Sequence, residues 1–243
     1  MSERRVVISG IGLITPLGIG ADETWRALCA GKSGIGEITR FDASDFQTKI
    51  AGEVKDFHPE DFLNQKDARR TTTFIAYAVA ATRMALQDSG LVIDQSNADR
   101  VGVFTGCGLG GLASLEETNR ILETKGPSRV SPFFIPMMIG NMAAGMISIQ
   151  VGARGPNACM ATACAAGSHS IGDAFKLVQQ GRADAMISGG VESVITPSCI
   201  AGFNAMKALS TRNDAPQKAS RPFDRDRDGF VVGEGGGIVI LET

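Results

Sequence analysis

The sequence predicts an α/β fold in which helices cover both faces of a mixed, largely parallel sheet. Short apolar runs of strand length alternate with longer stretches of helical length through most of the chain, which is the pattern that βαβ units produce. Several of these short runs are almost continuously apolar, as in strands buried on both faces. Apolar residues make up 43% of the 243 residues, which is ample for a large buried core.

The first part of the chain predicts two strands and a helix. Residues 6–11 (VVISGI) are short and almost wholly apolar, which predicts a buried strand. Residues 21–31 (ADETWRALCAG) predict a helix that begins at Asp22 or just before it. It ends at Gly31, because glycine is favoured directly after a helix. Residues 50–54 predict a further short strand.

The middle of the chain is richer in predicted helix. Residues 67–88 are rich in alanine and predict the longest helix, which a Ser-Gly pair then ends. Residues 101–105 predict a strand. Residues 137–151 are apolar nearly all round, so we expect a buried helix there. Residues 164–180 predict another helix, which stops at Gly181.

The last part of the chain predicts only strands. Residues 183–189 (ADAMISG) predict one strand. Residues 229–232 and 237–242 are two β-rich runs around a glycine cluster, which predicts a hairpin. The chain stops two residues after an apolar run at 238–241, without a polar tail, and this favours a domain boundary at that point.

Composition and charge argue against several classes of protein. Lys and Arg total 24 against 26 Asp and Glu, whereas a nucleic-acid-coating protein should carry a clear basic excess. No apolar stretch has the length that spans a bilayer, so we expect no membrane segment. Five cysteines without a secretory signal predict free thiols in the cytoplasm. Two histidines and no CxxC spacing predict neither a metal site nor another cofactor.

Two motifs imitate ligand sites but are better explained as turns. Residues 106–111 match the G-x-G-x-x-G dinucleotide pattern after a strand, yet loop-forming residues stand where the next strand should follow. A glycine turn that lets a backbone or ligand approach closely is therefore favoured. Residues 224–229 imitate the start of a calcium loop, but Gly235 stands where its bidentate glutamate should be. A salt-bridged turn is the better interpretation.

The segment around Cys164 carries the strongest chemical signal. Small residues flank it and a helix begins directly after it, so the positive end of the helix dipole favours its thiolate. A tight elbow of this kind exposes the nucleophile in other folds. From the residues alone, Cys164 is either a nucleophile or a small buried thiol. A pair with His169 is disfavoured because five helical residues turn the side chains about 140° apart. His169 then fits a hydrogen-bonded packing residue, and His58 fits an exposed one.

Several segments, in order along the chain, resemble the β-ketoacyl-[acyl-carrier-protein] synthases, and in particular their elongating type II members. The elbow carries residues 162–167 (TACAAG) and 171–174 (IGDA). The other matching segments are residues 6–18 (VVISGIGLITPLG), 131–136 (SPFFIP), 154–156 (RGP), 208–214 (ALSTRND), 220–223 (SRPF) and 227–234 (RDGFVVGE). This resemblance favours the nucleophile interpretation of Cys164.

The resemblance implies a thiolase-like fold of two similar α/β halves, in which residues 1–243 are the N-terminal domain. The family's two catalytic histidines, its lysine and its gating phenylalanine belong to the second half. Neither His58 nor His169 matches them. We therefore expect the C-terminal half to be absent from this chain, and the chain alone to be inactive in condensation.

The resemblance also implies a reaction. An acyl group moves from the pantetheine of a carrier protein to Cys164. Malonyl-carrier protein then loses CO2, and its carbanion attacks the thioester to give a 3-oxoacyl-carrier protein. The backbone N–H of Cys164 is implied in the oxyanion hole. By the same resemblance Leu109, Phe134 and Phe203 line or gate the acyl tunnel, with Phe134 reaching across a dimer interface. Ordinary core packing is the alternative for each.

The implied partners are an acidic acyl carrier protein and a second copy of the chain. The basic residues expected to dock the carrier protein are Lys66, Arg69, Arg70, Arg129 and Lys207. The first three crowd the expected first turn of the long helix, where cations oppose the helix dipole, and an anionic partner would explain them. A solvated basic face is the alternative. The homodimer is expected to form through residues 131–151.

Three other functions stay open at this point. A coenzyme A thiolase would use the same fold, although its cysteine loop differs and residues 227–234 favour the synthases. A polyketide ketosynthase subunit would share the motifs. The third is a non-catalytic domain or chain-length factor, although a chain-length factor usually lacks the cysteine.

Overall fold

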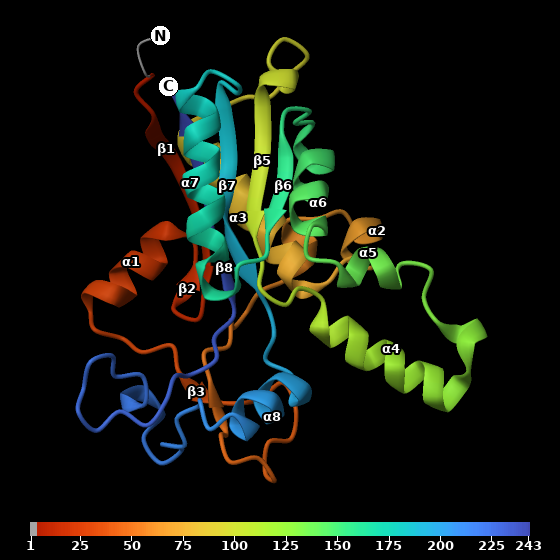
Figure 1. The fold of residues 1–243 in the computed structure, drawn as a ribbon, viewed down its shortest axis with the longest axis vertical. Helices are drawn as coiled ribbons and strands as arrows, with labels where there is room; N and C mark the ends of the chain where they lie inside the picture. Colours follow the sequence, from red (N-terminus) through yellow and green to blue (C-terminus); the bar gives the residue numbers. More distant parts are fainter. Residues whose placement is uncertain (1–3) are drawn as a thin grey trace.

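The computed structural model of the chain describes residues 4–243, in which a six-stranded sheet is flanked by helices (Figure 1). In spatial order its strands are β2 (Gly18–Ile19), β1 (Val7–Thr15), β8 (Gly235–Glu242), β7 (Ala185–Glu192), β5 (Val101–Gly106) and β6 (Asn157–Met160). A separate two-stranded sheet pairs β3 (Gly36–Glu37) with β4 (Ile50–Ala51). The predicted α/β class is confirmed.

The sheet is mixed, with one direction dominant. Strands β5, β6 and β7 are mutually parallel, and β8 runs antiparallel to β7 on one side and to β1 on the other. It follows that β1 points the same way as β5, β6 and β7, so that four of the six strands share a direction. The prediction of a mixed, largely parallel sheet is confirmed, and the carboxyl ends of β5, β6 and β7 meet at one edge.

Helices cover both faces of the sheet. On one face, α3 (Thr73–Ser89) packs on β1 and β8, and α6 (Met142–Val151) packs on β5 and α3. On the other face, α7 (Ala166–Gln179) packs on β7 and β5, in front of the sheet in Figure 1. Glycines in β1 allow α3 to lie close, since a Cβ on Gly12 would be 1.9 Å from the carbonyl oxygen of Ala81. A shorter helix, α1 (Ala21–Cys29), packs beside β1 and β2.

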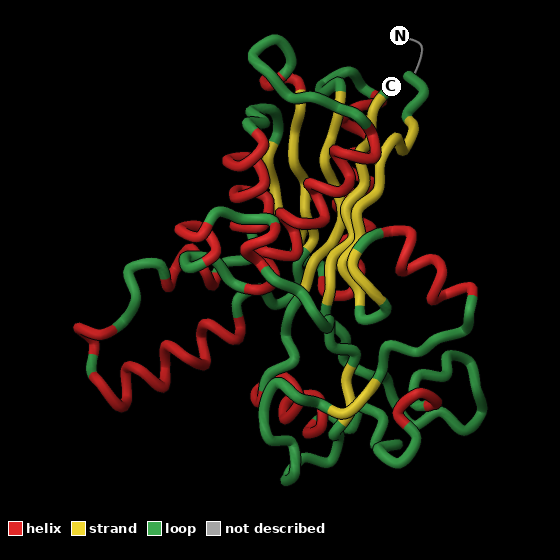
Figure 2. The backbone as a smooth tube through the Cα atoms, turned by 180° about the vertical axis from the view of Figure 1, so that it is seen from behind, coloured by secondary structure: helices red, strands yellow, loops and turns green. Residues whose placement is uncertain are grey.

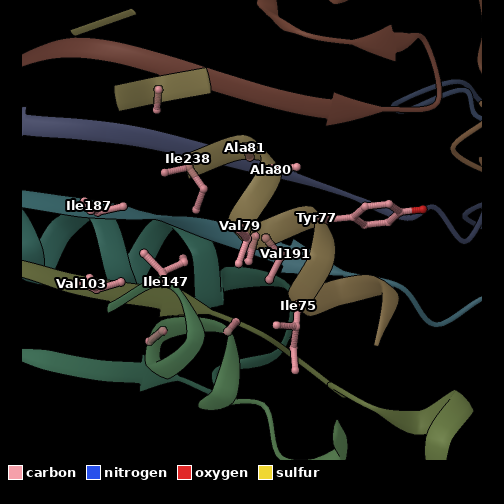
Figure 3. Packing of buried hydrophobic residues seen from close by; sticks show 14 of the residues in the cluster. Ile75, Tyr77, Val79, Ala80, Ala81, Val103, Ile147, Ile187, Val191 and Ile238 are labelled. Atoms are coloured by element: carbon pink, nitrogen blue, oxygen red, sulfur yellow. The ribbon is translucent and has the colours of Figure 1, made fainter. Parts of the chain in front are cut away.

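The main core lies between α3, α6 and the sheet. Val79 of α3 and Ile147 of α6 meet Ile187 of β7 and Ile238 of β8 there, and all four are at most 1% exposed (Figure 3). Burying an aliphatic side chain of this size stabilises the fold by about 1.5–3 kcal/mol. This core fixes the strands whose ends carry the site.

A smaller unit of loops and short elements lies beyond the carboxyl ends of the parallel strands (Figures 1 and 2). It contains the two-stranded sheet and α8 (Pro197–Ala205), with its own apolar cluster around Ile200 and Leu209. To one side, α4 (Leu112–Lys125) and α5 (Phe134–Met138) extend away from the sheet, and α4 buries none of its residues. Within residues 4–243, no helix combines the length and apolarity needed to cross a membrane.

Most predicted elements are present, with shifted ends. The strands predicted at 6–11, 50–54, 101–105 and 183–189 appear as β1, β4, β5 and β7, and the helices at 21–31 and 164–180 appear as α1 and α7. The helix α1 begins after Gly20, and Gly31 has a φ of +65° just beyond its end.

The single long helix predicted at 67–88 is wrong. The structure has a short helix α2 (Gln65–Ala68), a turn, and then α3. Thr72 has extended backbone angles, φ −104° and ψ 165°, and begins α3 as its N-cap. Its hydroxyl donates to the carbonyl oxygen of Met137 at 3.3 Å. Threonine favours such helix starts because its hydroxyl competes for backbone partners.

The buried helix predicted at 137–151 is also wrong in two respects. It is divided into α5 and α6, because Ile139 is extended and Gly140 follows it. Only Ala143, Ala144 and Ile147 of α6 are buried. Ile149 is 71% exposed, so the apolar composition of this segment reflects an uncovered surface as well as a core.

The hairpin predicted around the last glycine cluster is not formed. Residues 229–232 make one isolated bridge, between Phe230 and Leu209, instead of a strand beside β8. Strand β8 inserts between β1 and β7. Both neighbours bury it, which explains why its apolar run is continuous.

Candidate active site

The candidate active site lies at the shared carboxyl edge of β5, β6 and β7. The last residues of these strands are Gly106, Met160 and Glu192. The loops that follow them carry the glycine motif, the Cys164 elbow and the segment that leads to α8. Ligand sites in sheets of this kind form at the carboxyl ends of the parallel strands.

Cys164 is exposed at the turn between β6 and α7. The backbone turns at Ala163, whose φ of +52° lies in the left-handed region. For an alanine this conformation costs about 1–2 kcal/mol. A 3-10 turn, Ala163–Ala165, then leads directly into α7. The predicted strained elbow is therefore present, and the alternative of a buried thiol is wrong.

Small residues allow the start of α7 to lie directly on the sheet. A Cβ on Gly106 of β5 would be 2.1 Å from the carbonyl carbon of Ala166. Gly167 of α7 and Gly190 of β7 approach so closely that a Cβ on Gly190 would be 3.0 Å from the Cα of Gly167. The close contact brings the positive end of α7 to Cys164 at a fixed position over the sheet.

His169 contacts the elbow but not as the partner of a Cys–His pair. Its Nδ1 atom and the hydroxyl oxygen of Thr162 are 2.6 Å apart, so a hydrogen bond joins the elbow to the first turn of α7. His169 is nevertheless exposed, so it is hydrogen-bonded as predicted without being a packing residue. His58 is exposed, as predicted.

The other cysteines differ from Cys164 in their surroundings. Burial, followed by the nearby negative charge of Glu192, raises the pKa values of Cys107 and of Cys199, the latter to about 11. Burial also raises the pKa of Cys159. Cys29 is exposed, but it is the last residue of α1 and so does not stand at the start of a helix as Cys164 does.

The glycine motif forms a loop around a carboxylate of the chain itself. The backbone N–H groups of Gly108, Leu109 and Gly110 donate to the Glu192 carboxylate at 2.9, 2.8 and 3.1 Å. The Cys107 thiol donates to the same group at 3.5 Å. Three successive amides directed at one anion form the kind of cradle that holds phosphates elsewhere. Because Glu192 occupies it, the predicted glycine turn is confirmed and the dinucleotide alternative is not supported.

The protein-family model described as "Beta-ketoacyl synthase, N-terminal domain" matches residues 3–243 of this chain. This chain belongs to the β-ketoacyl synthase family. It is 57% identical over 242 residues to 3-oxoacyl-[acyl-carrier-protein] synthase 2 of Synechocystis, and 52% identical to the protein of that name from Vibrio cholerae. Each match covers 100% of this chain and 58% of the relative, so the chain spans a little over half the length of these proteins.

Solved structures give the same result. A β-ketoacyl synthase from Burkholderia phymatum superposes with a TM-score of 0.87 at 33% identity, over 100% of this chain and 59% of that one. A ketosynthase solved in complex with its type II polyketide acyl carrier protein superposes with a TM-score of 0.84 at 31% identity, over 99% and 58%. The thiolase-like ketosynthase fold is thus shown for this chain.

The residues that the family resemblance assigns to the acyl tunnel lie in two places. Leu109 is in the glycine loop and is 54% exposed. Phe134, the first residue of α5, lines a cavity of about 300 Å³ together with Gly110. Phe203 lies in α8, where its ring packs edge-on against Phe230 with centroids 5.1 Å apart. The structure therefore places Leu109 and Phe134 beside one loop, and Phe203 in a separate cluster.

Lys66, Arg69 and Arg70 do not lie together on the first turn of one long helix, as the sequence predicts. Lys66 lies in α2, and Arg69 and Arg70 follow it in the turn before α3. Arg70 stacks over the ring of Phe133 at 4.5 Å, which brings it to the segment just beyond Arg129. The placement of these cations on the first turn of the long helix is therefore wrong.

Lys207 lies apart from those residues, after α8, beside a depression of about 840 Å³. This depression also borders the loop that imitates a calcium site. In that loop Asp224 pairs with Arg221 at 2.7 Å, and Asp228 accepts from the hydroxyl of Ser210 at 2.7 Å. The predicted salt-bridged turn is confirmed. No cluster suited to a metal ion occurs among the described residues.

Sequence reasoning missed two residues of this site, Ala163 and Glu192. The left-handed conformation of Ala163 has no sequence signal of its own, because glycine is the residue that normally marks it. Glu192 does have a weak signal, since it is an acid at the end of an apolar strand that contains two glycines. Its partners lie more than 80 positions away, so only the fold connects them.

Proposed function

We propose that this chain is the nucleophile-bearing N-terminal domain of a 3-oxoacyl-[acyl-carrier-protein] synthase, a condensing enzyme of fatty-acid synthesis. The observation that carries the proposal is the exposed Cys164 thiol on a strained elbow at the start of α7. Membership of the β-ketoacyl synthase family supports it. So do relatives at 50–57% identity that bear this name.

In the first step, the Cys164 thiolate attacks the carbonyl carbon of an acyl thioester. The carbon–sulfur bond to Cys164 forms, the bond to the pantetheine sulfur breaks, and that sulfur leaves as a thiolate that takes up a proton. The helix dipole stabilises negative charge at the elbow. The backbone N–H of Cys164 is the proposed donor to the oxyanion.

In the second step, a malonyl thioester loses CO2 and its carbanion attacks the carbonyl of the Cys164 thioester. The new carbon–carbon bond extends the chain by two carbons and returns the Cys164 sulfur as a thiolate. The enolate that precedes this attack needs hydrogen-bond donors. The family's second half is the proposed source of those donors, because His169 is bonded to Thr162 and His58 is distant in sequence and exposed.

A polyketide ketosynthase is the second candidate. The ketosynthase solved with a type II polyketide acyl carrier protein is 31% identical to this chain, whereas relatives that bear the name 3-oxoacyl-[acyl-carrier-protein] synthase 2 are 50–57% identical. This difference favours fatty-acid elongation.

The proposed partner is an acyl carrier protein, which delivers both thioesters. A related ketosynthase has been solved with such a protein. The proposed docking cations are Lys66, Arg69 and Arg70, which lie in and after α2, together with Arg129 and Lys207, which the family resemblance adds. A solvated basic face is the alternative, and charge reversal distinguishes the two (Discussion).

We also propose a homodimer through the region of β6, α5 and α6. Strand β6 is the outermost strand and pairs on one side only, with β5, among the described residues. Ile135 and Ile149 near it are 54% and 71% exposed. An open edge beside exposed apolar side chains favours association of two copies.

The unpaired state of all five cysteines supports a cytoplasmic location.

Transfer of an acyl group from acyl-carrier protein to the purified chain tests the proposal. We expect one acyl adduct per chain, mapped by mass spectrometry to the peptide that contains Cys164. Cys164→Ala should abolish it, and Cys29→Ser, which removes the other exposed thiol, should leave it unchanged. A folded wild-type chain that is labelled equally at Cys29 contradicts the proposal.

A further inference from the structure

Glu192 is a half-buried carboxylate at the centre of the site, and nothing in the proposed chemistry uses it. It ends β7, where it pairs with Gly235 of β8, so its backbone is held in the sheet. Its side chain accepts hydrogen bonds from three consecutive backbone amides and one thiol of the glycine loop, residues 107–111. Hydrogen bonds to an ionised acceptor are about twice as strong as neutral ones.

The glycine loop lies next to the Cys164 elbow on one side and next to the end of α5 on the other. A Cβ on Gly108 would lie 3.9 Å from the Cα of Ala163 in the elbow. On the other side, the N–H of Gly111 donates to the carbonyl oxygen of Met138 at 2.9 Å, at the end of α5. Leu109 stands between these two contacts, with its own N–H on Glu192 at 2.8 Å.

We propose that Glu192 is a positioning residue: it fixes the glycine loop, and through the loop it sets where Leu109 meets the acyl chain beside Cys164. The proposal rests on the proposed function, because it assumes that acyl chains bind along Leu109. Three amides that point to one rigidly held carboxylate leave the Leu109 backbone little freedom, so its exposed side chain presents a defined wall. On that assumption a long acyl chain reaches the Leu109 side chain and a short one does not.

Glu192→Gln is the direct perturbation. The substitution keeps the shape but replaces one acceptor oxygen by an NH2 group, which cannot accept from the loop amides. We expect amide hydrogen exchange in a peptide covering residues 107–111 to become about tenfold faster. Glu60→Gln, the same change at an exposed position in the 3-10 turn Pro59–Asp61, is the matched control and should leave this exchange unchanged.

The functional readout is acyl selectivity. In Glu192→Gln, the ratio of Cys164 acylation by a twelve-carbon thioester to that by a four-carbon thioester should fall about fivefold. Alkylation of Cys164 by iodoacetamide, which does not reach Leu109, should stay within about twofold of wild type. A residue that merely stabilised the fold would change both reactions together.

A second variant tests the hydrogen bonds between Glu192 and the glycine loop without changing Glu192 itself. A Cβ on Gly108 would lie 3.0 Å from the Glu192 carboxylate oxygen, so Gly108→Ala should push the carboxylate away. We expect the same changes with smaller size, and no further loss when both substitutions are combined. This variant also covers the case in which Glu192→Gln does not fold.

The outcomes separate the two proposals. Faster loop exchange together with lost long-chain preference supports the positioning role. Unchanged exchange in both variants overturns it, and so does faster exchange with an unchanged chain-length ratio. Faster exchange in a protein whose wild type transfers no acyl group overturns both the proposed function and the acyl role of Leu109, while the contact between Glu192 and the loop stands.

Discussion

Gly106 determines how closely the start of α7 lies on the sheet, and Gly106→Ala tests that contact. A Cβ there would lie 2.1 Å from the carbonyl carbon of Ala166 and 2.3 Å from its oxygen. These are backbone atoms, so the helix start must move by about 1.3 Å to restore normal contact. We expect a loss of about 3 kcal/mol in unfolding free energy. For a chain of this size that lowers Tm by about 6–12 °C.

Gly172→Ala is the matched control, because Gly172 lies on the exposed side of α7 and a Cβ there meets nothing within 4 Å. Alanine favours helix over glycine by about 0.5–1 kcal/mol, so this variant should be slightly more stable than wild type. Thermal unfolding followed by circular dichroism measures both. The iodoacetamide rate at Cys164 should fall in Gly106→Ala only. A Gly106→Ala protein that melts within about 2 °C of wild type with an unchanged Cys164 rate refutes the reasoning.

Three further predictions concern charge and pH. Reversing the charges of Lys66, Arg70 and Arg129 should slow carrier-protein association at least tenfold at low salt, less at high salt, without changing acylation by a small uncharged thioester; equal losses with both substrates would make the patch structural. Cys199, with its pKa raised to about 11 by burial, should be roughly a thousandth ionised at pH 8 and gain reactivity only as the pH approaches that value, which alkylation between pH 8 and 11 measures. Burial opposes ionisation of Glu53, but hydrogen bonds from Lys55 and Thr39 hold the pKa of its carboxyl below the usual range. Its contribution is complete above the usual glutamate pKa and is lost as the pH falls through the lower folded value, so Glu53→Gln should weaken the pH dependence of urea unfolding between pH 5 and 3; an unchanged slope contradicts this.

The local parts of the fold could be predicted because their signals are local. A run of small residues followed by a helical stretch predicts the Cys164 elbow and α7 from contiguous sequence, whereas the short strand β6 before the elbow was not predicted. The break before α3 was missed because a helical pattern on both sides concealed the effect of Thr72, whose partner Met137 is distant in the chain.

The non-local parts could not be predicted. Insertion of β8 between β1 and β7 depends on strand order, which no single segment specifies. The same holds for Glu192, which is adjacent to the glycine loop only because β7 and β5 are neighbours. The exposed position of Ile149 was missed because the sequence of an apolar helix has the same pattern whether the helix faces a core or an uncovered surface.

Condensation by a hybrid synthase tests the central claim most directly. In the hybrid, this chain replaces the matching 242 residues of the 57% identical Synechocystis synthase. Supplied with acyl- and malonyl-carrier proteins, the hybrid should form 3-oxoacyl-carrier protein, Cys164→Ala should reduce the rate by at least about a thousandfold, and the 243-residue chain alone should form none. A folded hybrid that forms no product, or one that keeps its rate without the Cys164 thiol, would contradict the assignment of this elbow as the nucleophile of a condensing enzyme.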